Sequence, residues 1–494
     1  MSLRKFVWST VGVAAALVAC VGDNVVADTS SSGAPGASSS GAPSSSGEPG
    51  ASSSGEVGAS SSSGSVTNGC DGNDLVIDGT RSTCALGCKP ADTESARCKV
   101  FEPRGPATAA DLLRGGLGAL TLRGGDVVDV LSGQIKRGDT LLRQANTDAA
   151  DQVINNIAFR IVGEGDNRVA VLVAKSILIT GVSREDRLQW VGTVDGVTNE
   201  SNAAIPVVLV AQDDLKVETA LPLPCGQLGG FVGGGGSRAS RVGGGPGGGN
   251  SNEATGTGAG GSHGTKGGNG SGTPTSGPGS QSVYNGTFEL RGGSGGGGGR
   301  MLGEGVAPGG SGGAALGLVA GKALWIGDGT DGHGISAGGC GADAINISGR
   351  PAITSGGGGA GGFLSLESPI IHGAAGAGLA ANGGGGAGWN STGGGARGQH
   401  GALSITPAAG GGPGVDGCQV AGGNGAAGDT AATSASNTTV GCATPRGAGG
   451  GGGLGRIVLG TANNGQLEVP ANATFILSPS AAPALQRFTI DVEN

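Results

Sequence analysis

The sequence predicts an all-β protein whose main domain is an irregular parallel β-solenoid with glycine-rich inserts. Pairs of short strands, joined by a bend of three or four residues, recur five times along the chain. Glycine supplies 113 of the 494 residues, whereas aromatic residues supply 13 (Phe 8, Trp 4, Tyr 1), so any core must be thin and aliphatic. No segment has the apolar spacing of a long amphipathic helix.

The chain begins with the features of a secretory signal, and residues 1–19 are predicted to be a lipoprotein signal peptide. Two basic residues, Arg4 and Lys5, precede an uncharged and mostly apolar run that ends in Leu17-Val18-Ala19-Cys20. These last four residues resemble the lipobox of bacterial lipoproteins, which are cleaved before the cysteine and diacylated on its sulfur. A short transmembrane anchor is the alternative, but residues 6–19 would span only about 21 Å as a helix, against roughly 30 Å of bilayer core. We therefore expect a lipid anchor on Cys20, and Val21 after it resembles lipoproteins sorted to the outer membrane.

Residues 20–68 are predicted to form a flexible tether. They repeat SSSG, GAPG and GASSSG and carry few charges. Ser/Gly/Ala/Pro-rich sequence of this kind behaves as a random coil, and about 45 residues reach roughly 35–40 Å on average. This segment would hold the folded part of the protein away from a membrane.

The chain contains nine cysteines, and lipidation of Cys20 would leave eight to form disulfides in an oxidising compartment. Four of them lie within residues 69–105 with the spacing C-x13-C-x3-C-x9-C, which predicts a small disulfide-bonded cap. A zinc site is less favoured because this segment has no CxxC pair and no histidine between the cysteines. The pairing stays open, since eight cysteines allow 105 combinations. The candidates are Cys70, Cys84, Cys88, Cys98, Cys225, Cys340, Cys418 and Cys442.

Residues 106–494 are predicted to form the β-solenoid-like domain. One or two helical turns are expected at residues 107–113, and separate β runs follow from Leu117 onward. The strand pairs then recur at 171–179, 208–217, 318–326, 363–371 and 456–469. Strands within residues 466–494 are expected to cover the exposed end of the stack, because solenoids need atypical terminal repeats.

The glycine-rich inserts, mainly 233–313, 356–362 and 383–455, allow two interpretations. They could be flexible loops between solenoid turns. Alternatively, they could pack on one another as extended polyglycine helices, the glycine counterpart of polyproline II. A regular bundle of such helices would favour glycine at every third residue, and the sequence shows no strict period of three. Collagen is excluded on the same ground.

Motifs that look like catalytic or binding sites lack the context that their chemistry needs. GxSxG occurs at Ser294 and Ser311, but neither has a strand before it and a helix after it. Residues 69–77 resemble one nonapeptide of the calcium-binding RTX roll, whose sites need tandem copies. The four histidines are far apart and are interpreted as isolated surface residues. No catalytic residue, cofactor site or metal site is therefore predicted.

The clearest polar cluster in the predicted repeats is Asp213-Asp214, with Lys216 two residues on. Carboxylates on one face of a solenoid could bind or cleave polysaccharide, as in the pectate-lyase-like solenoids that the repeats resemble. Such a pair is also typical of a solvated turn between two strands. The net charge of −8 argues against nucleic acid as a partner.

Taken together, the lipobox at residues 17–20, the SSSG/GAPG tether, the cysteine cluster at 70–98 and the strand pairs separated by GGGG inserts give the chain a family resemblance. It resembles the glycine-rich surface lipoproteins of myxobacteria that are labelled PE-PGRS-like, although it lacks a PE domain. This resemblance implies an exported, surface-located protein and no particular activity. We expect a non-enzymatic lipoprotein of the outer membrane or cell surface, held to the membrane at Cys20, with a structural or adhesive role in the envelope or extracellular matrix. The alternative is a polysaccharide-binding or polysaccharide-cleaving solenoid.

Overall fold

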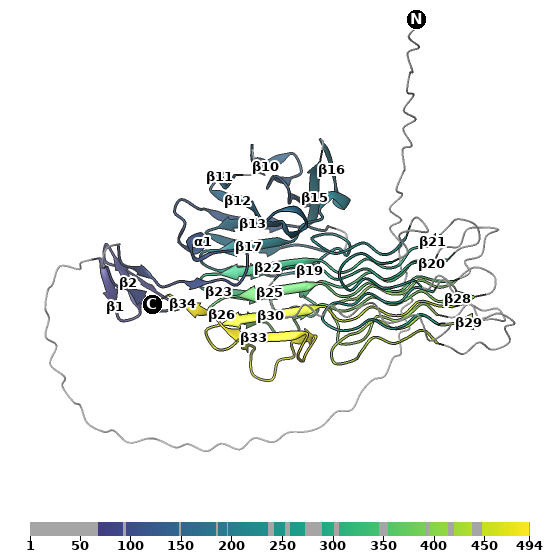
Figure 1. The fold of residues 1–494 in the computed structure, drawn as a ribbon. Helices are drawn as coiled ribbons and strands as arrows, with labels where there is room; N and C mark the ends of the chain where they lie inside the picture. The colour runs from purple at the N-terminus through teal and green to yellow at the C-terminus, as the bar shows by residue number, and fades with distance from the viewer. Residues whose placement is uncertain are drawn as a thin grey trace, which may run out of the picture. The chain divides into compact units, whose positions relative to one another are not determined.

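The computed structural model describes residues 68–91, 95–147, 150–183, 186–194, 196–235, 242–251, 257–271, 289–300, 306–344, 354–390, 395–412, 419–436 and 447–493. All of them belong to one compact unit, Gly64–Asn494 (Figure 1). The predicted signal peptide, Cys20 and all of the predicted tether except Asn68 lie outside the described residues. The described part is nearly all β, as predicted. Its helical elements are α1 (Ala109–Leu113), near the expected helical turns, and two 3-10 turns at Gly165–Asn167 and Glu200–Asn202.

The largest sheet has eight strands, and from β13 to β33 its strands are all parallel. The antiparallel pairs β11–β12 and β12–β13 begin the sheet. In spatial order the strands are β11 (Gln152–Ile154), β12 (Ile157–Val162), β13 (Val169–Ala174), β17 (Val207–Ala211), β22 (Ala315–Ala320), β25 (Phe363–Glu367), β30 (Arg456–Thr461) and β33 (Leu485–Thr489).

Two further parallel sheets run beside it. The six-stranded sheet consists of β7 (Ala119–Arg123), β14 (Ser176–Thr180), β18 (Leu215–Val217), β23 (Ala323–Ile326), β26 (Ile370–Gly373) and β31 (Leu467–Glu468). The four-stranded sheet consists of β19 (Ala220–Pro222), β24 (Gly334–Ser336), β27 (Gly378–Ala380) and β32 (Ile476–Ser478). Consecutive strands such as β17, β18 and β19 lie in the three different sheets, and the four repeat units that begin at β17, β22, β25 and β30 each contribute one strand to every sheet. The unit that begins at β13 contributes strands to the first two sheets only. The predicted pairs supply the first two strands. The third is short and built partly from glycine, alanine and serine, and only that of the last unit, β32, lies where strands were predicted, within residues 466–494.

The strand register stacks like residues on like residues in the core. In the eight-stranded sheet Leu209 pairs with Leu318, and Leu318 pairs with Leu366. All three side chains are fully buried. Each buried leucine contributes about 1.5–3 kcal/mol, so a column of aligned leucines compensates for the scarcity of aromatic residues.

The first end of the stack carries a separate five-stranded sheet. Its strands are β10 (Thr140–Arg143), β9 (Ile135–Arg137), β8 (Asp126–Asp129), β15 (Gln189–Val194) and β16 (Val197–Asn199). The Arg143 guanidinium is fully buried here and donates hydrogen bonds to the carbonyl oxygens of Gly133, Ile157 and Gln152 at 3.0–3.1 Å. A buried charge needs this degree of hydrogen bonding, because an unpaired one would cost several kcal/mol.

The cysteine-rich segment folds as short antiparallel strands joined by two disulfides, Cys70–Cys88 and Cys84–Cys98. Its strands are β1 (Gly69–Asp71), β2 (Asp74–Ile77), β3 (Thr80–Thr83), β4 (Cys88–Lys89) and β5 (Arg97–Cys98). The next strand, β6 (Phe101–Glu102), pairs antiparallel with the C-terminal strand β34 (Asp491–Val492). The segment therefore contacts the end of the chain, which its place in the sequence did not indicate.

The glycine-rich segments run side by side beyond the strand stacks (Figure 1). They leave from the ends of strands in the four-stranded sheet and return to strands of the eight-stranded sheet, as between β24 and β25. Two short antiparallel pairs occur within them, β20 (Gly299–Arg300) with β21 (Val306–Ala307) and β28 (Trp389–Asn390) with β29 (Gln419–Val420).

Candidate functional site

The most extensive ordered feature outside the strand stacks is the array of glycine-rich segments, and segment 356–362 lies at its centre. Its N–H groups donate with a period of three: residues 357 and 360 to segment 292–300, residues 358 and 361 to segment 447–455, and residues 359 and 362 to segment 337–342. The N···O distances are 2.7–3.0 Å. Its carbonyl groups accept bonds from three further segments, 257–264, 308–313 and 382–388. A threefold period of this kind matches the three residues per turn of a polyproline II-type helix.

Close backbone contact explains why the central segments are almost continuous glycine. A Cβ on Gly358 would collide with the carbonyl oxygen of Gly384, and one on Gly359 with that of Ser311. Because segment 356–362 faces other backbones on every side, all three positions of the period must be small, and the fully buried Ala360 is its largest residue before Phe363. Glycine at every third residue would be enough only for a segment that contacts neighbouring backbones on one side. The flexible-loop interpretation is therefore wrong for the described parts of the three inserts, and the packed interpretation is confirmed there.

One disulfide, Cys225–Cys340, connects two segments of the array that are 115 residues apart in the sequence. A ring nitrogen of His400 lies within 4.8 Å of both sulfur atoms, and its Nδ1 accepts a hydrogen bond from the Gly341 N–H at 3.1 Å. Metal ions bind thiolates, so the disulfide form of this trio does not provide a metal site. The remaining candidates, Cys418 and Cys442, lie outside the described residues.

His263 corrects the interpretation of the histidines as surface residues. Its side chain is buried in the array, where Nδ1 lies 3.1 Å from the Gly361 carbonyl oxygen and the ring meets Phe363 edge-to-face at 6.2 Å. Burial lowers the pKa of His263 to about 4, with the nearby Arg456 acting in the same direction. The ring is therefore neutral at neutral pH. The burial of His263 could not be predicted from its low-complexity flanking sequence, because it depends on neighbours more than ninety residues away.

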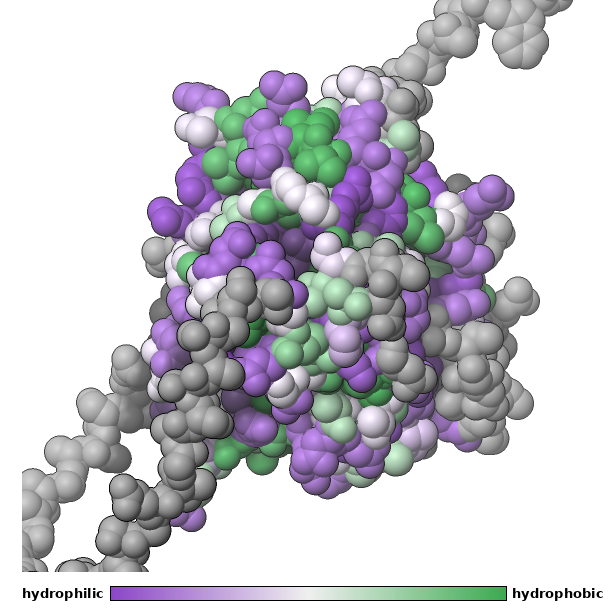
Figure 2. Space-filling view, turned by 90° about the vertical axis from the view of Figure 1, so that its left-hand side faces the viewer, coloured by the Kyte–Doolittle hydropathy of each residue, from purple (hydrophilic) through white to green (hydrophobic). Residues whose placement is uncertain are grey.

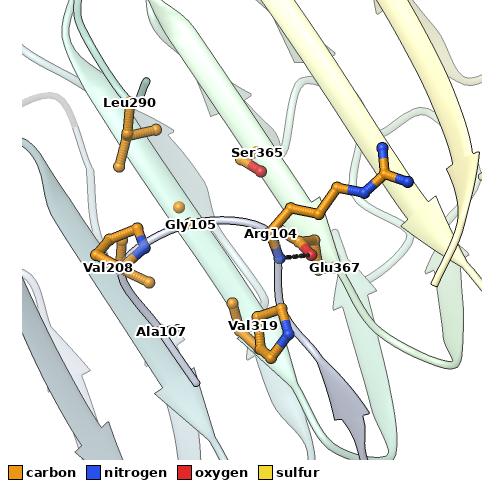
Figure 3. A pocket seen from close by; sticks show the side chains of 11 residues that line it. Arg104, Gly105, Ala107, Val208, Leu290, Val319, Ser365 and Glu367 are labelled. Carbon is orange, nitrogen blue, oxygen red and sulfur yellow. Dashed lines mark hydrogen bonds between the residues drawn. The ribbon is translucent and has the colours of Figure 1, made fainter. Parts of the chain in front are cut away.

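A buried carboxyl group lies in a small pocket on the outer face of the eight-stranded sheet (Figure 3). Glu367 of β25 is 2% exposed, and its Oε2 accepts a hydrogen bond from the Arg104 backbone N–H at 2.7 Å. Burial raises the pKa of Glu367 to about 7, against the opposing effect of Arg104. The hydroxyl of Ser365 lines the same pocket and acts with Arg104 to lower the pKa of Glu367, against the larger effect of burial.

The walls of this pocket limit what it can do chemically. Besides Ser365 and Glu367 it is lined by Arg104 and by aliphatic residues, among them Val208, Val319 and Leu290 (Figure 3). Among the described residues that line it, Glu367 is the one carboxylate, and none is a histidine. The segment around Arg104 crosses the strands above Glu367 in Figure 3, and the carboxyl group holds that segment to the sheet.

Asp213 and Asp214 occupy the bend between β17 and β18, as the solvated-turn interpretation predicted. The Asp213 carboxylate forms an ion pair with Lys322 at 2.8 Å, and its backbone N–H donates to the Lys175 carbonyl oxygen. The Asp214 carbonyl oxygen accepts a bond from Ile177 N–H. In this arrangement the Asp213 carboxylate is neutralised by a lysine of the next repeat unit.

An aromatic residue on the outer face of the six-stranded sheet was not singled out from the sequence. Trp325 is 40% exposed and is the one aromatic among the large hydrophobic side chains that the described residues expose. It pairs in register with Lys216 on one side and His372 on the other. The Trp325 and His372 rings stack at 3.8 Å, the Lys216 ammonium lies 5.7 Å from the indole centroid, and His372 Nδ1 lies 3.3 Å from Glu468. The alignment of positions 216, 325 and 372 is visible only once the register of the repeats is known.

The remaining motifs have structural roles in the described chain. Ser294 and Ser311 lie within the array, where their hydroxyl groups accept hydrogen bonds from Gly247 and Gly233 N–H groups. Residues 69–77 form the β1–β2 hairpin, and the carboxylates of Asp71 and Asp74 pair with Arg81. On the face shown in Figure 2, hydrophilic side chains separate the hydrophobic ones into small groups.

Comparison of the chain with protein-family models, curated proteins and solved structures gave no match. Within the part of the chain that the structure describes, no helix has both the length and the apolar character needed to span a bilayer.

Proposed function

We propose that this protein is a non-enzymatic lipoprotein of the outer cell surface with a structural or adhesive role. In this proposal its three parallel sheets are the faces of an irregular β-solenoid. Cys20 carries the lipid, and residues 20–68 act as the tether. The similarity to PE-PGRS-like lipoproteins of myxobacteria that the sequence suggests belongs to the same proposal.

The observation that carries the proposal is the glycine array. Its interior offers backbone amides that are already hydrogen-bonded to one another, and few side chains that could bind or react. Such an arrangement provides rigidity rather than chemistry, because each added contact fixes backbone against backbone. The Cys225–Cys340 disulfide adds a covalent link between its segments, which suits an oxidising environment.

The lipid anchor is tested by the substitution Cys20→Ala in the producing cell. We expect the variant to appear as uncleaved precursor or in the soluble fraction, whereas the wild type stays with the outer membrane and is accessible to external protease. Cys225→Ala serves as the control, since it removes a cysteine, and with it the Cys225–Cys340 disulfide, without touching the lipobox. Unchanged fractionation of the Cys20 variant would contradict the anchor.

Polysaccharide binding is the second candidate, and exposed Trp325 is the observation that favours it. Aromatic rings flanked by polar groups suit ligands with both apolar and hydroxyl-bearing faces. Trp190 and Trp389 are 1% and 2% exposed, and Trp8 lies in the predicted signal peptide, so quenching of tryptophan fluorescence by acrylamide reports mainly on Trp325. Plant and bacterial polysaccharides that bind there should protect the fluorescence, and Trp325→Ala should abolish pull-down. Release of new reducing ends would indicate cleavage and contradict the non-enzymatic proposal.

A further inference from the structure

Residues 103–114 cross the outer face of the eight-stranded sheet from its last strand to its first repeat units. At one end the Arg104 guanidinium lies 3.8 Å from the Phe488 ring of β33, and the Arg104 N–H binds Glu367 of β25. The middle of the segment covers Val319 of β22 and Val208 of β17 (Figure 3). At the other end Asp111 forms a bidentate ion pair with Arg160 of β12 at 2.5–2.7 Å.

The segment is held at both ends by further polar contacts. Near its start, β6 pairs with the C-terminal strand β34, and the Glu493 carboxylate binds Arg97 and Lys89 of the cysteine-rich segment at 2.6–2.7 Å. Near its end, the Gln212 side chain after β17 donates to the carbonyl oxygens of Asp111 and Arg114.

A second hydrophobic layer lies between this segment and the sheet. It contains Phe101, Ala107 and Leu112 from the segment and its approach, packed with outward-facing residues of seven sheet strands, β12, β13, β17, β22, β25, β30 and β33. The sheet residues of this layer include Ala158, Val171, Val208, Val319, Phe363 and Phe488. The layer therefore runs along the stack and across the strands, in the same direction as the hydrogen bonds that join neighbouring repeat units.

This placement has a consequence for how the stack opens. In a linear stack each repeat unit contacts only its neighbours, so the two ends can open independently. A segment bonded to the first and last repeat units adds contacts between parts of the chain that strand pairing does not connect. We propose that residues 103–114, named here the strap, couple the two ends of the stack so that loosening one end loosens the other.

The test perturbs the last end of the stack and measures hydrogen exchange at the first end. Hydrogen exchange by mass spectrometry is compared between the full wild-type chain in detergent and its Glu493→Ala variant. Glu493 lies beyond every strand of the three stacks, and loss of its charged hydrogen bonds should raise exchange rates nearby by roughly tenfold. If the strap couples the ends, peptides covering α1 and β12 should exchange faster as well. A change confined to residues 85–102 and 485–493 would overturn the proposal.

Two further variants separate coupling from general destabilisation. Glu468→Ala removes an exposed carboxylate of the last repeat unit that contacts His372 and lies away from the strap, so its effect should not reach α1. A short Gly-Ser insertion between Arg104 and Gly105 keeps the contacts at both ends but slackens the strap. In that background Glu493→Ala should affect only the last end. If the Glu493 variant does not fold, the insertion is compared directly with the wild type. Coupling would be refuted if the insertion left the exchange protection of both ends of the stack unchanged.

Discussion

A single added methyl group tests whether the glycine array is packed as the structure has it. In Gly359→Ala the new Cβ would collide with the carbonyl oxygen of Ser311, and Gly359 also donates to Cys340 and accepts from Gly384, both at 2.9 Å. Relief of the collision would require one segment to move away from its neighbours. We therefore expect both hydrogen bonds to be strained or lost.

The expected cost follows from these contacts. Overpacking in a close-packed interior costs about 1–3 kcal/mol, and each buried backbone group left without a partner costs about 1–3 kcal/mol. The lower conformational entropy of alanine in the unfolded chain offsets about 0.4–1 kcal/mol. The free energy of unfolding should fall by about 3–5 kcal/mol, a large part of the roughly 5–15 kcal/mol typical of a folded protein.

The measurement is equilibrium unfolding in urea of the wild type, Gly359→Ala and a matched control. Gly412→Ala adds the same methyl group to the same array, but at an exposed position with nothing within 4 Å of the new atom. It should be neutral or slightly stabilising. Equal stability of the two variants would refute close packing of segment 356–362.

Four other predictions have defined outcomes. Leu318→Ala removes a fully buried side chain from the leucine column and should lower the free energy of unfolding by about 2–5 kcal/mol in urea titrations. The raised pKa of Glu367, about 7 in the folded state, means that the protonated form is favoured by folding. The contribution of Glu367 to the free energy of unfolding is present below pH 4.5 and is lost as pH rises through 7. Glu367→Gln should therefore abolish a loss of about 3 kcal/mol in the free energy of unfolding that the wild type shows by pH 8. A variant with the wild-type pH profile would contradict this expectation. His263 has the opposite dependence, because its lowered pKa of about 4 makes stability fall as pH drops from 6.5 toward 4; His263→Gln should flatten the unfolding profile in that window. With Cys20 lipidated and six cysteines paired, Cys418 and Cys442 remain, and peptide mapping without reduction should recover them linked to each other; free thiols at both would contradict four disulfides.

Much of the strand content could be predicted from local sequence. The segments 157–162, 318–326 and 363–371 are rich in aliphatic and β-branched residues and are bounded by glycine or polar turns, and all three form strands. The turn at Asp213 was also predictable, since paired aspartates favour bends. These features depend on a few neighbouring residues, and the sequence carries them directly.

The candidate sites were harder to predict, for two different reasons. Trp325 lies in a predicted strand, but its alignment with His372 depends on the register between repeat units separated by an insert of variable length. Glu367 also lies in a predicted strand. Its burial comes from the segment around Arg104, which is 263 residues away in the sequence. In both cases the contacting residue, His372 or Arg104, lies far away in the sequence from the residue that it contacts.

Composition and local patterns were enough to predict a β-rich chain, recurring pairs of strands and a thin aliphatic core. The hydrogen-bond period of three between the glycine segments, the pairing of Cys225 with Cys340 and the burial of His263 became known only from the three-dimensional arrangement of the chain. The cause of this difference is glycine itself. Because glycine has no side chain, a glycine-rich segment shows no alternation of apolar and polar residues that would indicate its buried faces. The hydrogen-bond partner of each backbone amide therefore depends on which distant segment lies alongside it.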